Sequence, residues 1–327
     1  MVSEKENIRR YYAHELPDHY ADLSKGLYTQ IPMVSIRPIR GAHEDWFGVK
    51  YAYDPLIKSW SVPCDPRVVS DVTRWEEELK FPDLDNIVDW EALAKEEAAD
   101  EQTRETKIYS VLLQCGVYER FHSLLGMENA MMALLEEPEA SKAMLDAIGD
   151  YRCRLIEKFI DYYKPDIIRN HDDYGTQIAL QMNPDTWREM IKPQLKKIAD
   201  LCHSKGVFYE QHSCGIIEPV VEDIMEIGAD SFQGMHINNV PMLLEKTKGK
   251  LLYHMSLNTP DYLVNDMAGK LDENWLREDV RKTLEACAPS GCYFNVPPGV
   301  AAAPANWWVL KVINEELDRI REKIGTF

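Results

Sequence analysis

The chain has 327 residues, 45% of them hydrophobic, and a formal net charge of −18 at pH 7. Such an excess of acidic side chains repels phosphate backbones, so nucleic acid is not expected as a partner. No apolar stretch is long enough to span a membrane, and the polar N-terminus does not resemble a signal peptide. The seven irregularly spaced cysteines favour reduced thiols, and therefore a cytoplasmic protein.

Strand and helix patterns alternate along the whole chain. After a short helix at 3–16, apolar and β-branched runs predict seven strands, at 31–37, 108–113, 166–169, 207–214, 230–233, 251–255 and 292–296. An aromatic hairpin is expected at 45–51. Apolar residues that recur every three or four positions predict helices at 66–79, 119–125, 128–135, 138–164, 184–205, 216–227, 260–268, 273–287 and 304–324.

This alternation requires a parallel sheet covered by helices, which is an α/β fold. Because no glycine-rich nucleotide fingerprint follows the first strand, a closed (β/α)8 TIM barrel with one strand missed fits better than an open nucleotide-binding sheet. We therefore expect an N-terminal helical extension at 1–30 and a single barrel domain at 31–327.

The fourth predicted strand ends in a polar cluster. Glu210, His212 and Cys214 are two residues apart, so they share one face if the strand stays extended until Gly215. A thiolate and a neutral imidazole form a good zinc pair. By itself, this pattern also fits a packed cysteine beside a hydrogen-bonded histidine.

Polar residues follow the other predicted strands as well, at the edge where a barrel carries its active site. They are Arg37 and Arg40, the segment 171–177 (HDDYGTQ), Gln233 and His236, His254 and Asn258, and Cys292 and Asn295. Together they predict an active site. Since successive residues point differently, we expect one of the adjacent carboxylates Asp172 and Asp173 to face the substrate and the other to brace the loop.

Three motifs together resemble the uroporphyrinogen decarboxylase-like superfamily: 172–177 (DDYGTQ), 212–215 (HSCG), and 291–299 combined with Asn306. The resemblance extends over about residues 30–325. The superfamily includes metal-free decarboxylases of uroporphyrinogen and zinc enzymes that transfer methyl groups to or from cobalamin or a thiol. The segment 37–41 (RPIRG) does not match the Arg-Gln-Ala-Gly-Arg motif of the decarboxylases, whereas His-x-Cys-Gly matches the methyltransferase branch.

The resemblance implies a methyltransferase of the O-demethylase type. It would move a methyl group from a small methylated donor, such as a methyl ether, to a corrinoid protein, with zinc as Lewis acid and cobalamin on the partner. The implied metal ligands are His212, Cys214 and Cys292, the last because Val300 stands where the family often has a cysteine. The alternatives are that Cys292 belongs to the core and that Glu210 or His236 is a further ligand.

Further roles complete this interpretation. The implied catalytic residues are Asp172, Asp173 and Glu210, and the implied substrate-binding residues are Arg37, Tyr174, Gln177, His236 and Asn295. The sequence also allows a homodimer. A metal-free uroporphyrinogen-type decarboxylase and a non-catalytic relative remain as alternatives.

Overall fold

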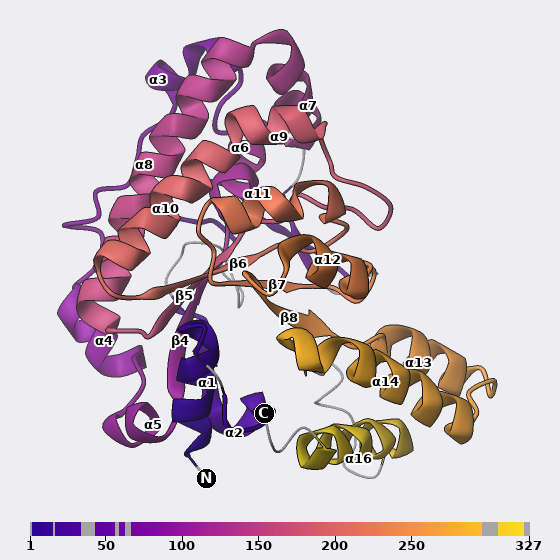
Figure 1. Cartoon of the computed structure of the whole chain (residues 1–327). Coiled ribbons are helices and arrows are strands. Elements are labelled where there is room, and N and C mark those ends of the chain that lie inside the picture. The colour runs from indigo at the N-terminus through magenta and orange to yellow at the C-terminus, as the bar shows by residue number, and fades with distance from the viewer. Residues whose placement is uncertain are drawn as a thin grey trace.

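The structure is a computed structural model that describes residues 2–15, 17–33, 43–55, 59–62, 67–295 and 307–323. Its centre is a parallel sheet of seven strands, which curls and carries helices on its outer side (Figure 1). The strands are β1 (Leu27–Gln30), β4 (Ile108–Leu113), β5 (Ile167–His171), β6 (Phe208–His212), β7 (Ser231–Gly234), β8 (Leu252–Ser256) and β9 (Cys292–Asn295). They follow one another in chain order, as in a TIM-barrel-like single domain.

The barrel is open in the described residues. The edges of the sheet are β1 and β9, and no pairing joins them in the part of the chain that the structure describes. The expected order of strand–helix units is therefore correct, but closure by eight strands is not seen within these described ranges. At the hairpin expected at 45–51, an isolated antiparallel bridge joins Glu44 to Lys50. A separate hairpin follows, in which β2 (Ala52–Asp54) pairs with β3 (Ser59–Ser61).

The first strand was predicted at the wrong place. Leu27–Gln30 pairs with β4, whereas residues 31–33 belong to no strand and residues 34–37 lie outside the described ranges. Pro32 has no N–H to donate to a neighbouring strand, which explains why the pairing stops at Gln30. The segment expected as a helical extension, 1–30, thus ends in a strand of the main sheet.

Fifteen α-helices lie in the described ranges. They are α1 (Glu4–Tyr12), α2 (Leu23–Gly26), α3 (Trp75–Glu78), α4 (Trp90–Glu97), α5 (Glu101–Thr106), α6 (Val117–Leu125), α7 (Met127–Glu136), α8 (Pro138–Tyr163), α9 (Pro184–Met190), α10 (Lys192–Ser204), α11 (Val221–Glu226), α12 (Val240–Thr247), α13 (Thr259–Met267), α14 (Glu273–Cys287) and α16 (Trp308–Lys323). None of these helices is long and apolar enough to cross a membrane.

Local sequence explains the longest helices. Pro138 occupies the first turn of α8, and Lys164 ends it in a left-handed conformation before Pro165. The apolar stripe of α8 is buried, and α8 packs beside α10 on the outer side of the sheet (Figure 1). The single helix expected at 184–205 divides into α9 and α10, because Pro193 lies in the first turn of α10 and interrupts the hydrogen-bond ladder.

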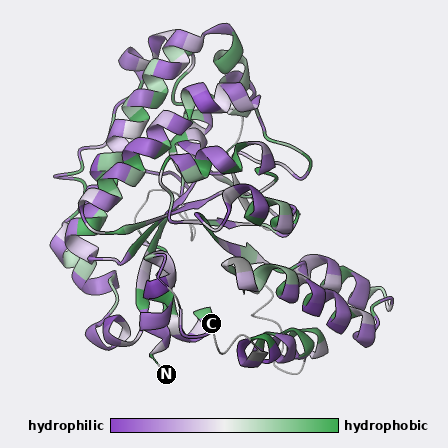
Figure 2. Ribbon diagram, viewed as in Figure 1, coloured by the Kyte–Doolittle hydropathy of each residue, from purple (hydrophilic) through white to green (hydrophobic). Residues whose placement is uncertain are grey.

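The core lies between the sheet and its helices. Hydrophobic side chains of the strands and helices pack together there, whereas hydrophilic residues are widespread on the helices that surround the sheet (Figure 2). Helix α1 approaches the sheet from the amino ends of the strands, where the ring of Tyr12 lies 5.4 Å from that of Phe208, the first residue of β6. The opposite, carboxyl ends of the strands carry the polar residues singled out from the sequence.

Candidate metal centre

Four side chains meet at the carboxyl ends of β5 and β6. His171 and His212 are paired in register, and their stacked rings have centroids 4.4 Å apart. Asp173 places Oδ1 3.3 Å from Nε2 of His212 and Oδ2 3.8 Å from Nε2 of His171. The Sγ atom of Cys214 lies 3.5 Å from the same Nε2 of His212. We call these four residues the strand-end cluster.

Both histidines are oriented by a bond at Nδ1. Nδ1 of His171 lies 2.9 Å from Oε2 of Glu119, and Nδ1 of His212 contacts Oε1 of Gln233. Because both oxygens accept, each neutral ring carries its proton at Nδ1 and presents the Nε2 lone pair to the cluster. A carboxylate or amide oxygen behind the imidazole is the usual arrangement for histidines that bind metal ions.

Two glycines bring the turns after β5 and β6 into contact. A Cβ atom at Gly215, whose φ is +81°, would lie 2.1 Å from the carbonyl carbon of Gly175. The turns are further joined because the N–H of Cys214 donates to Oδ1 of Asp173 at 2.6 Å. The absence of side chains at both glycines therefore allows Asp173 to sit beside Cys214.

The electrostatics of the cluster favour an ionised carboxylate. Burial disfavours the charge of Asp173, but at acidic pH, where His171 and His212 are protonated, the hydrogen bond with His212 and the charges of both rings outweigh burial and hold the pKa of Asp173 well below its ordinary value. An ionised carboxylate, two imidazole nitrogens and a thiol are zinc ligands. Donors held about 2.0–2.3 Å from one tetrahedral ion lie roughly 3.3–3.8 Å from one another. The separations of 3.3 and 3.8 Å fit that geometry, and the ligand atoms of His171, Asp173 and His212 all lie within 4.8 Å of one another. Cys214 approaches this group through His212, at 3.5 Å.

Asp172 points the other way. Its side chain is fully buried, and its two oxygens accept the backbone N–H groups of Tyr118, at 3.1 Å, and Glu119, at 2.8 Å. It therefore caps the N-terminus of α6 from a neighbouring strand. Burial, reinforced by repulsion from Glu119, raises the pKa of Asp172 to about 7. The two adjacent carboxylates thus have different surroundings, and the role of either toward a substrate stays a prediction.

Glu210 lies on the inner face of β6, two residues before His212, and does not join the cluster. It forms a buried ion pair with Arg169 and accepts hydrogen bonds from the hydroxyls of Tyr12, at 2.8 Å, and Ser231, at 2.7 Å. Burial opposes its charge, but the positive charge of Arg169, together with the interactions of His254 and Ser231, outweighs burial and keeps the pKa of Glu210 well below its ordinary value.

Cys292 lies on the opposite face of the sheet from the cluster. Its register partner is Tyr253, whose hydroxyl donates to the carbonyl of Leu243 in α12 and so faces the outer helices. The inner position on β9 belongs to Tyr293, the register partner of His254. Since alternate residues of a strand point to opposite faces, the fully buried thiol of Cys292 is directed away from the strand-end cluster.

The predicted substrate-binding residues have different surroundings. Tyr174 is fully buried, with its ring 5.3 Å from that of Trp187, whereas Gln177 is exposed. His236 is half-buried and donates its backbone N–H to Ser256 at 3.3 Å. Arg37 lies outside the described ranges, and the structure describes Asn295 only as part of β9, without its side chain.

Sequence reasoning missed two contributors to the cluster. His171 was noted as one polar residue among several, but its pairing with His212 depends on the register of β5 with β6. Glu119 lies in a helix 52 residues away from the histidine that it contacts, and no motif marks it. The only sequence signal for Glu119 is its place in the first turn of a helix that follows a strand end.

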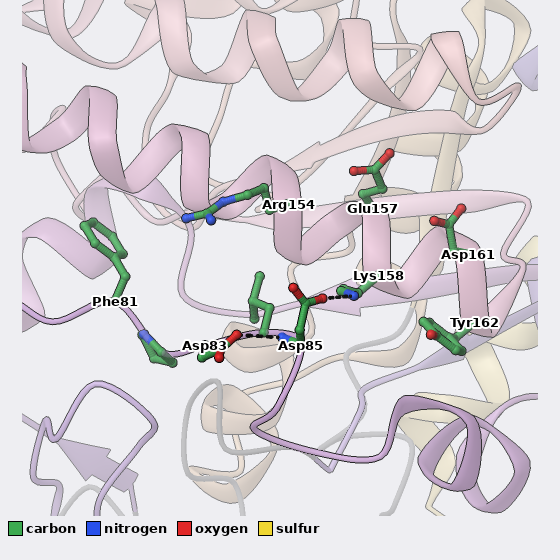
Figure 3. A pocket seen from close by; sticks show the side chains of 10 residues that line it. Phe81, Asp83, Asp85, Arg154, Glu157, Lys158, Asp161 and Tyr162 are labelled. Atoms are coloured by element: carbon green, nitrogen blue, oxygen red, sulfur yellow. Dashed lines mark hydrogen bonds and ion pairs between the residues drawn. The ribbon is translucent and has the colours of Figure 1, made fainter.

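A prominent surface cavity lies elsewhere. It has a volume of about 480 Å³ and is formed between α8 and the segment 81–85 (Figure 3). Its lining includes Asp85, which pairs with Lys158 at 2.5 Å, and Arg154. None of the strand-end residues lines this cavity, so it offers no support for a site there.

Comparison with known proteins supports the sequence motifs. A family model described as uroporphyrinogen decarboxylase (URO-D) matches residues 120–250, which include the strand-end cluster. The resemblance to the uroporphyrinogen decarboxylase-like superfamily is confirmed. No curated protein gives a significant match.

Solved structures extend this likeness over the chain. A methyltransferase from Methanosarcina mazei is 12% identical, with a TM-score of 0.62, and the match covers 98% of this chain and 99% of that one. At such identity the likeness shows a shared fold alone. A protein called IOLI, with a binding zinc atom, is 11% identical, covers 57% of this chain and 72% of that one, and has a TM-score of only 0.34.

Proposed function

We propose that the protein is a zinc-dependent methyltransferase of the O-demethylase type, which moves a methyl group from a small methylated donor to a corrinoid protein. The strand-end cluster carries this proposal, because two histidine nitrogens and a carboxylate oxygen lie within 4.8 Å of one another where a barrel-like fold places its chemistry, and a thiol lies 3.5 Å from one of these nitrogens. The fold shared with the methanosarcinal methyltransferase and the URO-D family match are consistent with it.

The four cluster residues are the proposed ligands. His212 and Cys214 would bind through Nε2 and Sγ. The carboxylate of Asp173 and Nε2 of His171 would supply the remaining two ligands, in place of Cys292. Zinc held there supplies a Lewis acid that stabilises negative charge developing on an ether oxygen. Because four protein ligands would fill a tetrahedral site, one of them would have to leave the zinc before a substrate oxygen could bind the metal directly.

The remaining residues hold this arrangement in place. Glu119 fixes the ring of His171, and Asp172 fixes the helix that carries Glu119. Gln177 and His236, at the carboxyl ends of the strands, are the described residues proposed to contact the donor. Tyr174, buried against its neighbours, is proposed to shape the loop. A corrinoid protein is proposed as acceptor because thiolates cleave unactivated ethers too slowly.

Metal analysis tests the site directly. Purified wild-type protein should contain about one zinc per chain, and Cys214→Ser and Asp173→Asn should each lose most of it. Cys292→Ser is the matched control, since its thiol points away from the cluster, and it should retain zinc when folded. With Co²⁺ in place of zinc, the thiolate-to-cobalt absorption band should be present in wild type and absent from Cys214→Ser. Equal zinc contents in wild type and Cys214→Ser would refute the site.

Activity is tested separately. The protein is incubated with a panel of methoxylated donors, with and without a reduced corrinoid protein from the same source. Demethylation should require the corrinoid protein. Turnover that is unchanged without it would overturn the proposed acceptor, and release of CO₂ from uroporphyrinogen would assign the protein to the decarboxylases instead.

A further inference from the structure

A third histidine lies in the same layer of the sheet as the strand-end cluster. His171, His212, Gln233 and His254 are successive register partners on β5, β6, β7 and β8. All four therefore project from the same height onto the inner face of the curled sheet. His254 is 7% exposed and is not part of the proposed metal site.

The ring of His254 is held in one tautomer. Nη2 of Arg169 lies 3.2 Å from its Nδ1, and a guanidinium can only donate, so Nδ1 must be the accepting nitrogen. The carboxylate of Glu210 does not compete for a proton at Nδ1. Its Oε2 is 3.7 Å away and already accepts from Tyr12 and Ser231. A neutral His254 consequently carries its proton at Nε2.

The Nε2–H group that results has nothing to bind among the described residues. Nε2 of His254 is buried and lacks a hydrogen-bond partner. Burial, which outweighs the attraction of Glu210, lowers the pKa of His254, so the ring stays neutral and keeps this single donor. A buried donor left unsatisfied costs about 1–3 kcal/mol, which is a reason to seek its partner in a ligand.

We propose that the Nε2–H group of His254 donates a hydrogen bond to an oxygen atom of the substrate, and that Arg169 is the positioning residue that fixes its tautomer. This inference rests on the proposed function for the nature of the substrate. Because Glu210 neutralises Arg169, this part of the inner face presents a neutral donor instead of a free cation. Such a donor suits an ether, hydroxyl or carbonyl oxygen better than a cluster of carboxylates.

Nuclear magnetic resonance of the histidine side chains tests the proposal without any turnover. In ¹⁵N-labelled, zinc-loaded full-length protein, the ring of His254, assigned by its loss in His254→Gln, should show the neutral Nε2–H tautomer. In Arg169→Met, proton exchange between the two nitrogens should appear. Methanol, methoxybenzene and 2-methoxyphenol serve as probes, and at least one should shift the Nε2–H signal. An Nδ1–H tautomer in wild type, or no shift with any of the three probes, would overturn the proposal.

Binding measurements provide the second arm. His254→Leu should weaken the affinity for the probe that shifts the signal by roughly tenfold, the effect of one hydrogen bond. His254→Gln, whose amide N–H can replace Nε2–H, should stay within about threefold of wild type. His203→Leu, at a 41% exposed side chain paired with Asp230, is the control and should bind as wild type does. Unchanged affinity in a folded His254→Leu would contradict the inference.

The two proposals can fail independently. Methyl transfer by wild-type protein, with a His254 signal that no probe disturbs, would remove this inference and leave the proposed function. A disturbed His254 signal with no methyl transfer to a corrinoid protein would remove the proposed reaction and leave the binding role of His254.

Discussion

Single residues at the strand ends act through one another. Asp172 accepts the backbone N–H of Glu119 at 2.8 Å, and the side chain of Glu119 in turn contacts Nδ1 of His171 at 2.9 Å. Asp172 approaches so closely that a Cβ atom at Gly116 would lie 2.3 Å from its own Cβ. Asp172, which is not itself a proposed metal ligand, thus orients the proposed ligand His171 through the N-terminus of α6.

Replacement of Gly215 tests the contact between the two turns. In Gly215→Ala, both the positive φ and the clash with the backbone of Gly175 oppose the native turn. We expect a loss of about 2–5 kcal/mol in the free energy of unfolding, together with loss of zinc. Urea denaturation after removal of metal by a chelator measures the first effect without a contribution from zinc, and metal analysis of the untreated protein measures the second.

Gly206 supplies the matched control. Its φ of +72° is nearly the same, but a Cβ atom there would meet nothing within 4 Å. Gly206→Ala should therefore cost only the backbone strain, about 1 kcal/mol, and should retain zinc. Similar losses in the two variants would show that backbone conformation, and not the close approach of the turns, makes Gly215 necessary.

At this scale, sequence reasoning succeeded for residues close together on one strand. The spacing of His212 and Cys214 placed them on one face, because strand periodicity is local. Cys292 was assigned to the site although its strand was predicted at 292–296, close to the observed Cys292–Asn295. Which of its residues face inward depends on pairing with β8, and that register is not encoded in the nearby residues.

Among the elements, α14 and α16 show how the C-terminal helices are joined. Glu316 of α16 is only 4% exposed, yet it lies between three arginines. Its carboxylate is 3.6 Å from Arg277, 2.9 Å from Arg281 and 3.1 Å from Arg319. The hydrogen bond from Arg281, with the charges of the neighbouring arginines, outweighs burial and lowers the pKa of Glu316.

Glu316→Gln should destabilise this helix pair in a pH-dependent way. A carboxyl group whose pKa is lowered in the folded state stabilises the fold above its unfolded pKa of about 4.3, and this stabilisation is lost as the pH falls through the lower folded value. We expect the free energy of unfolding to fall by about 1–2 kcal/mol at pH 7. The effect is no larger because two of the arginines are two-fifths exposed to solvent. Below about pH 4, the difference in stability from wild type should shrink.

Urea denaturation of both proteins at several pH values measures this difference, and contributions from other titrating groups cancel. Glu278→Gln is the control within α14, since Glu278 is exposed and pairs only with Lys282 among the described residues. It should change stability little at any of these pH values. A Glu316→Gln difference that persists undiminished at low pH would mean that packing, and not charge, accounts for the loss.

Helices and strands whose apolar residues recur at a regular spacing were predicted well. The bounds expected for β4 and α14 equal those observed, because their burial pattern depends on the segment itself. The helix expected at 66–79 shrinks to a 3-10 turn, Val72–Arg74, followed by α3. Two acidic side chains explain part of this difference. Asp71 caps the start of the 3-10 turn, and the carboxylate of Glu78 accepts a hydrogen bond from the hydroxyl of Ser70, just before that turn.

For the molecule as a whole, the N-terminal segment ties distant parts of the sheet together. Tyr12 donates to Glu210 of β6 at 2.8 Å, and Tyr20 donates to the carbonyl of Cys292 in the edge strand β9 at 3.0 Å. The N–H of Phe294 returns a bond to Tyr20 at 3.3 Å. The described residues of the segment 2–30 therefore supply the edge strand β1 and buried contacts to β6 and β9, which neither composition nor periodicity revealed. The homodimer allowed by the sequence stays a prediction.

The closing prediction follows from this attachment. In Tyr12→Phe, the buried carboxylate of Glu210 loses one of its donors, so we expect a loss of about 1–3 kcal/mol in the free energy of unfolding, within a single cooperative transition. Urea denaturation followed by both circular dichroism and tryptophan fluorescence measures it. Tyr28→Phe, at a 38% exposed ring on β1, should change stability by less than about 0.5 kcal/mol. If α1 were instead an independent extension, Tyr12→Phe would produce an early, separate loss of helix while the main transition stayed at the wild-type urea concentration.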